Sequence, residues 1–118
     1  MSGQIPISSL SNQLIARMPK TLRKILVANC EIVDLKRGDF LCEAGKPYAY
    51  IYFPVTSEIA LIVTLSNLKK LEQGGVGCEG MLGATLALGL NVALLDAMVQ
   101  SAGTAMRMGS ESFGAMLR

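Results

Sequence analysis

The segment from Leu35 to Gly45 constrains the fold of this chain more than any other part of the sequence. It predicts a strand that ends near Leu35, a turn at residues 37–39 and a second short strand over residues 40–43. Glycine adopts positive φ without steric cost, so Gly38 and Gly45 are expected where the chain changes direction. This pattern predicts a fold of short strands joined by tight turns.

Further strands are expected after Cys30, because from there the apolar residues follow a period of two. The run Ile59–Val63 is apolar on both faces, as is typical of a central strand. The stretch over residues 68–77 is also expected to be extended, but broken by its glycines. The remaining expected strands cover residues 32–36, 48–53, 57–65, 97–101 and 104–108.

Short helices are expected near both ends of the chain. The first covers residues 11–18, with Ser11 or Asn12 as its N-cap. The others are a helix over residues 21–29, a short helix or turn over residues 81–88, and a helix that opens at Ser110, its expected N-cap. Many short strands at close spacing, flanked by helices, predict a mainly β fold of the antiparallel barrel or sandwich type.

The length and composition indicate one globular domain. The chain has 118 residues, of which 51% are hydrophobic and 17% charged, and this balance argues against disorder. The net charge of +2 is too small to indicate nucleic-acid binding by itself. The longest uncharged run, residues 80–95, is shorter than the roughly 18–20 apolar residues that a membrane-spanning helix needs. No contact with a membrane is therefore expected.

The cysteines Cys30, Cys42 and Cys78 are odd in number and far apart. This usage fits a reducing cytosol better than a disulfide framework, and the first residues lack the apolar core of a signal peptide. A cytoplasmic protein is therefore expected. The cysteines lack the Cys-x-x-Cys spacing of zinc and iron–sulfur sites, so we interpret them as small hydrophobic residues.

No catalytic set is visible in the sequence. The chain has no histidine, which is the commonest general base, and its carboxylates are not paired at a meaningful spacing. We therefore expect a protein that is not an enzyme and that has no cofactor and no metal.

Several segments, taken in order, resemble the N-terminal sensor domain of Crp/Fnr-type transcription regulators. They are a first helix that ends in Met18-Pro19, then residues 35–39, Tyr52-Phe53-Pro54, residues 77–83 and residues 99–108. The resemblance implies a cyclic-nucleotide-binding-like domain, which is an antiparallel double-stranded β-helix (a β-roll or jelly roll), spanning residues 1–118. It also implies a bacterial regulator that contacts DNA only through a C-terminal dimer helix and helix-turn-helix domain, both missing from this chain.

The sequence departs from relatives that bind cAMP in the region that holds the cyclic phosphate. Those relatives carry an arginine there, and residues 86–99 of this chain contain none. From Leu71 to Met106 there is no lysine or arginine at all, whereas Glu72, Glu79 and Asp96 are acidic. Charge-assisted contacts are the strong ones for such anions. We therefore expect an unknown small-molecule effector other than cAMP, or none.

The effector would lie between the loop at residues 77–83 and the strands around residues 59–63 and 97–101. The candidate ligand-binding residues are Gly77, Glu79, Gly80, Met81 and Val99. Glycines in such a loop could cradle a phosphate or could form a tight turn, and we favour the turn because the spacing matches no phosphate-binding motif. The alternative function is a structural or oligomerisation module without ligand, whose degenerate pocket is filled by Leu86, Leu88, Leu94 and Leu95.

A weak homodimer is expected through the last helix. Phe113, Met116 and Leu117 fall at i, i+3 and i+4, which places them on one helical face.

Overall fold

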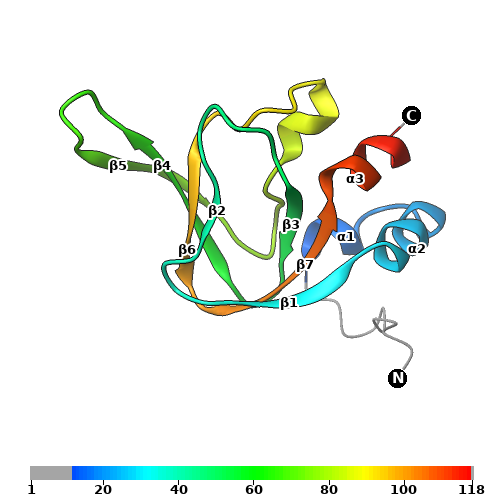
Figure 1. Ribbon diagram of the computed structural model, residues 1–118. Helices are drawn as coiled ribbons and strands as arrows, with labels where there is room; N and C mark the ends of the chain where they lie inside the picture. Colours follow the sequence, from blue (N-terminus) through cyan, green and yellow to red (C-terminus); the bar gives the residue numbers. More distant parts are fainter. Residues whose placement is uncertain (1–11, 118) are drawn as a thin grey trace.

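The computed structural model describes residues 12–117, which form two β-sheets with helices on one side (Figure 1). All paired strands are antiparallel, in the order β1-β7-β3 in one sheet and β2-β6-β4-β5 in the other. The strands are β1 (Glu31–Leu35), β2 (Phe40–Cys42), β3 (Tyr50–Pro54), β4 (Glu58–Thr64), β5 (Lys70–Val76), β6 (Asp96–Ser101) and β7 (Gly103–Gly109). The helices are α1 (Gln13–Ala16), α2 (Lys20–Ala28), the 3-10 helix η2 (Ala84–Leu88) and α3 (Ser110–Met116). The expected mainly antiparallel β fold with flanking helices is confirmed.

The expected turns lie at Gly38 and Gly45. Their φ angles are 92° and 85°, in the left-handed region that favours glycine. The first turn is closed by the Asp39 amide, which donates to the Lys36 carbonyl at 2.9 Å. The segment that links β1 to β2 therefore reverses as the sequence predicts.

Strand β4 lies between β6 and β5, which confirms that the run apolar on both faces is a central strand. The expected break in β5 is wrong, because the strand continues through Gly74 and Gly75. The pairing shifts register between Leu61 and Ile62, so the extra residue is absorbed by a bulge. A side chain at Gly75 would crowd the Ile59 carbonyl, its Cβ only 3.3 Å from that oxygen.

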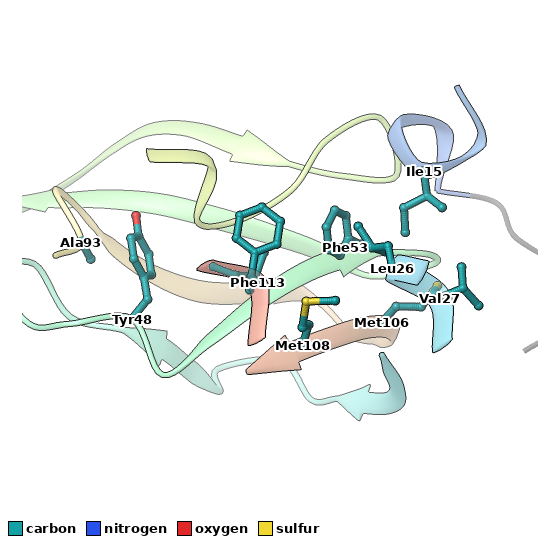
Figure 2. Packing of buried hydrophobic residues seen from close by; sticks show 10 residues of the cluster. Ile15, Leu26, Val27, Tyr48, Phe53, Ala93, Met106, Met108 and Phe113 are labelled. Atoms are coloured by element: carbon teal, nitrogen blue, oxygen red, sulfur yellow. The ribbon is translucent and has the colours of Figure 1, made fainter. Parts of the chain in front are cut away.

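The helices cover one face of the three-stranded sheet with a closely packed hydrophobic cluster, which we call the helix-side cluster (Figure 2). In Figure 2 it extends from Ile15 and Val27 at one end to Tyr48 and Ala93 at the other. Its members are Ile15, Leu26, Val27, Tyr48, Ile51, Phe53, Ala93, Met106, Met108 and Phe113. Because alternate strand residues point to opposite faces, this cluster takes the odd positions of β3 and the even positions of β7.

The ends of the helices agree with the sequence at α1 and differ at α3. Asn12 is the N-cap of α1, and its side chain accepts a hydrogen bond from the Ile15 amide at 3.1 Å. At α3 the predicted cap is wrong, because Gly109 occupies the N-cap and Ser110 is the first helical residue. The Ser110 amide donates to the carbonyl of Ala49, the residue before β3, at 3.0 Å, so the helix end is fixed by this backbone contact instead of by a side-chain cap.

Two of the three residues of the expected dimer face on α3 pack within the domain. Phe113 is only 4% exposed and belongs to the helix-side cluster, and Met116 packs against the same cluster. Leu117 alone of the three is exposed. Phe113 and Met116 therefore pack on the domain's own core and Leu117 does not, while the expected weak dimer itself stays a prediction.

All three cysteines are free thiols, and Cys30 and Cys42 pack against the core. Burial raises the pKa of Cys30 to about 12. Burial, with a smaller effect of Asp96, raises the pKa of Cys42 to about 11. Both thiols therefore stay neutral at physiological pH, in keeping with small hydrophobic residues.

Candidate functional site

The second face of the three-stranded sheet packs against the four-stranded sheet. We call the buried residues between the sheets the inter-sheet cluster: Leu35, Tyr52, Ile59, Leu82, Ala97, Val99 and Ala105. Several of these side chains are small, and Leu82 comes from the loop that follows β5 instead of from a strand. The loop at residues 77–83 therefore closes one end of the space between the sheets.

This loop is anchored to α1 and β3 by Asn12. The Asn12 side chain is fully buried, and its Nδ2 donates to the carbonyls of Pro54 at 2.8 Å and Gly80 at 3.0 Å. The adjacent Gln13 amide donates to the Cys78 carbonyl at 2.6 Å. One buried side chain thus forms hydrogen bonds with backbone groups of a helix end, a strand end and the loop.

The glycines at the start of the loop form a turn. The Gly80 amide donates to the Gly77 carbonyl at 3.1 Å, and the Gly77 amide donates to Glu79 Oε2 at 3.1 Å. Both amides are occupied, so neither is free to receive a phosphate oxygen. The turn interpretation is confirmed.

Two backbone hydrogen bonds then attach the loop to β3. The Tyr52 amide donates to the Leu82 carbonyl at 3.2 Å, and the Leu82 amide donates to the Tyr52 carbonyl at 2.8 Å. Gly83 follows with a φ of 105°, where a Cβ would collide with Ile51 Cδ1. The backbone at this point requires glycine for both reasons.

A half-open hollow of about 210 Å³ lies between this loop and the four-stranded sheet. We call it the apolar hollow, because none of its lining residues is charged. The lining residues are Tyr48, Leu61, Val76, Met81, Leu82, Gly83, Ala84, Thr85, Leu94 and Leu95. Its polar side-chain groups are two hydroxyls, Tyr48 Oη and Thr85 Oγ1, which lie 3.1 Å apart in hydrogen-bond contact.

A second hollow of about 200 Å³ lies at the start of the loop, and we call it the acidic hollow. Its lining includes the carboxylates of Glu58 and Glu79 and the amide of Gln100. Glu79 is tied to the Gly77 amide and Glu58 to the Ser101 hydroxyl, at 3.1 and 3.2 Å. No lysine or arginine lines either of these two hollows.

Two wider hollows, of about 420 and 350 Å³, lie over strands of the four-stranded sheet. They are lined partly by charged side chains, among them Lys70, and neither includes a residue of the 77–83 loop.

Arg107 is the first cation after the long segment that has none, and it is already engaged. Its Nε donates to Glu31 Oε2 at 2.7 Å, and its guanidinium carbon lies 4.1 Å from the centroid of the Tyr50 ring. The hydrogen bond to Glu31 raises the pKa of Arg107. Arg107 does not line either hollow beside the loop.

Solved structures share this arrangement of strands. The N-terminal domain of a transcriptional regulator from Streptomyces coelicolor A3(2) superposes with a TM-score of 0.73 at 20% identity, over 92% of this chain and 77% of that chain. The sensor domain of the transcriptional regulator DNR from Pseudomonas aeruginosa gives 0.72 at 12% identity, over 91% and 72%. The regulatory domain of Toxoplasma gondii PKA, crystallised with cAMP, gives 0.81 at 11% identity, over 98% of this chain and 47% of that one.

The fold is the β-roll of cyclic-nucleotide-binding domains. No protein-family model and no curated protein matches the chain. At these identities the solved structures establish the fold alone. The ligand has to be inferred from the side chains of this chain.

The β-roll separates the candidate residues that the sequence grouped together. Gly77 and Glu79 line the acidic hollow, whereas Met81 lines the apolar hollow. The Gly80 carbonyl is held by Asn12. Val99 is fully buried in the inter-sheet cluster.

Sequence reasoning missed the two hydroxyls of the apolar hollow. Tyr48 is nearly buried, and a buried tyrosine usually directs its hydroxyl to a polar partner, which is the signal that could have marked it. Its partner Thr85 lies 37 positions away, so no local pattern connects the two residues.

Residues 12–117 contain no helix long and apolar enough to cross a membrane. They also contain no group of three or more potential metal ligands among their cysteines, aspartates and glutamates.

Proposed function

We propose that this chain is the sensory domain of a Crp/Fnr-like transcription regulator that binds a small-molecule effector other than cAMP. The fold supports a regulatory ligand-binding role, since the solved structures with this β-roll include an N-terminal domain and a sensor domain of transcriptional regulators. The observation that carries the exclusion of cAMP is the absence of lysine and arginine from both hollows beside the loop.

A cyclic phosphate would lack cationic partners in the two hollows beside the loop at residues 77–83. The Gly77 and Gly80 amides already donate within the turn, and the acidic hollow presents Glu58 and Glu79. An anion placed there would lose its hydration without gaining a charge-assisted hydrogen bond. The effector is therefore one that does not depend on a phosphate contact.

In this proposal the effector acts through the loop and the helices attached to it. The loop is tied to α1 through Asn12 and Gln13. After the loop, Leu86 of η2 packs against the cluster that contains Phe113 of α3. A ligand that shifts the loop would therefore displace helices at both ends of the domain, and these would reorient a C-terminal dimer helix and DNA-binding domain. Residues 1–118 form the sensor domain in a cytoplasmic, non-enzymatic regulator that contacts DNA only through that other domain.

The alternative function is a structural or oligomerisation module that binds no ligand. The small volume of the apolar hollow and the presence of Leu94 and Leu95 in its wall favour it. However, Leu88 is 79% exposed and Leu86 packs against the helix-side cluster, so neither fills the hollow.

Native mass spectrometry of the protein purified from its source tests the proposal, together with calorimetric titration by cAMP. We expect a co-purifying small molecule and no saturable heat with millimolar cAMP. A micromolar affinity for cAMP would refute the exclusion. If no small molecule of any kind is ever found on the protein, the structural-module alternative holds.

A further inference from the structure

We infer that the apolar hollow selects an uncharged ligand about the size of a substituted six-membered ring, which places one polar group against the Tyr48–Thr85 hydroxyl pair. This inference rests on the proposed sensory function, because it names the chemical class of the effector that the β-roll takes.

The first argument is the chemistry of the wall. Leucine, valine and methionine side chains surround the hollow, and no carboxylate, ammonium or guanidinium group is among its lining residues. A charged ligand would lose its hydration here without an opposite charge to compensate, which is strongly unfavourable. An apolar ligand would instead gain free energy in proportion to the surface that it removes from water.

The second argument is size. The hollow has a volume of about 210 Å³. An apolar cavity of roughly 150 Å³ accepts benzene, so this hollow accommodates one six-membered ring with a few additional atoms. A nucleotide, with a purine and a ribose as well as a phosphate, is too large for it.

The third argument is the hydroxyl pair. Tyr48 Oη and Thr85 Oγ1 lie 3.1 Å apart, and whichever of them donates, the other keeps its proton for a further acceptor. Both oxygens also retain lone pairs. The pair can therefore donate to, or accept from, a single polar group on a ligand, and it would discriminate a hydroxylated ring from its methyl analogue.

The fourth argument is access. Leu94 lines the hollow and is 63% exposed, so it lies at the boundary between the hollow and solvent. A small ligand can reach the interior beside this side chain without opening of the sheet.

The experiment compares phenol, toluene and benzoate, which share one ring and differ in a single substituent. Binding to the full chain is followed by NMR titration of the methyl signals of Leu61, Met81 and Leu82. We expect saturable shifts with phenol and toluene, and binding of benzoate weaker by about tenfold or more because its carboxylate must be desolvated. In Thr85→Val, the affinity for phenol should fall by about three- to tenfold, while the affinity for toluene should stay the same or rise.

Two variants that fill the hollow locate the site. Val76→Phe and Leu95→Phe should each abolish binding of phenol and toluene, and the use of two variants covers the case in which one fails to fold. Leu71→Phe is the matched control, because Leu71 is also on β5 but is exposed and is not a lining residue. It should bind both probes as the wild type does.

The outcomes separate this inference from the proposed function. If benzoate binds as tightly as phenol, or if the Phe variants bind both neutral probes normally, the inference is wrong. If the neutral probes fail but native mass spectrometry finds a charged molecule on the wild type, the ligand class is wrong and the sensory function stands. If neither the probes nor any co-purifying molecule bind, the proposed function fails together with the inference.

Discussion

The two faces of the three-stranded sheet are packed in different ways. On the helix side the sheet contributes large side chains, and Phe53 and Met106 are fully buried beneath α1, α2 and α3 (Figure 2). On the inter-sheet side it contributes side chains of mixed size, Leu35, Tyr52 and Ala105, which belong to one cluster with Ala97 and Val99 of the opposite sheet. One strand, β7, supplies both faces, because its residues alternate between them.

This difference indicates which part of the domain contributes most to stability and which part has space for a ligand. Protein interiors approach crystal-like density, and a face filled with phenylalanine and methionine leaves no space for a further molecule. The apolar hollow instead lies between the loop at residues 77–83 and the four-stranded sheet, where Leu82 is the buried member of the inter-sheet cluster that lines it. Binding is therefore expected on the side of the sheet that contributes less to stability.

The largest expected loss of stability comes from a substitution in the helix-side cluster. Phe53→Ala should lower the free energy of unfolding by about 3–5 kcal/mol, because it removes a fully buried ring from a filled cluster. Leu61→Ala, in the wall of the hollow, should cost less than about 2 kcal/mol, because Leu61 is only partly buried and borders existing space. Urea denaturation of both variants measures the difference, and equal losses would contradict the proposed division between the two faces.

The next effect concerns the glycines that bound η2. Gly83→Ala should lower the free energy of unfolding by about 2–4 kcal/mol, since it adds a collision with Ile51 to the cost of a left-handed backbone. Gly89→Ala is the control: its φ is 90°, but no atom lies within 4 Å of the added Cβ, so only about 1–2 kcal/mol is expected. Thermal unfolding of the pair should separate the two contributions, and an equal cost would show that Ile51 moves aside freely.

A smaller loss of stability is expected on removal of the Asn12 side chain, which anchors the loop at residues 77–83 to α1 and β3. Asn12→Ala should cost about 1–3 kcal/mol, because it leaves the Pro54 and Gly80 carbonyls without their donor and removes the cap of α1. Gln13→Ala is the matched control on an exposed neighbour, and it should change stability by less than about 0.5 kcal/mol. Hydrogen exchange of the loop amides provides a second measurement, and unchanged protection at Gly80 in Asn12→Ala would argue against the anchor.

The smallest expected effect is an alkaline loss of stability from the cysteines. The folded pKa of Cys30 is about 12, above the ordinary value of 9.0, because burial disfavours the thiolate. Below pH 9 the thiol is protonated in both states and its contribution is fully present. Between about 9 and 12 the unfolded chain loses the proton first, so the free energy of unfolding falls as pH rises.

Urea denaturation at a series of pH values measures this loss. Cys30→Ala should show a shallower decline above pH 9 than the wild type, although its stability at neutral pH is lower. The same decline in both proteins would assign the alkaline sensitivity to other groups. Cys42 should add a similar but smaller slope, since its folded pKa is about 11.

Several local features of the fold could be predicted from the amino-acid sequence. Local preferences predicted the turns at Gly38 and Gly45 and offered Asn12 as one of two candidate caps, and the double-sided apolar run marked β4 as central. These features depend on a few consecutive residues, which is the range over which φ, capping and periodicity act. The lack of a lysine or arginine from Leu71 to Met106 can also be counted directly in the sequence.

Other features were decided only by the tertiary structure, because they depend on residues brought together from distant parts of the chain. Ser110 does not cap α3, and its amide donates to the Ala49 carbonyl instead. Phe113 is buried in the helix-side cluster. Arg107 is engaged by Glu31, 76 positions away. The hydroxyl pair of the apolar hollow forms only when the two sheets and the loop after β5 come together, since strand pairing across such distances leaves no local pattern in the sequence.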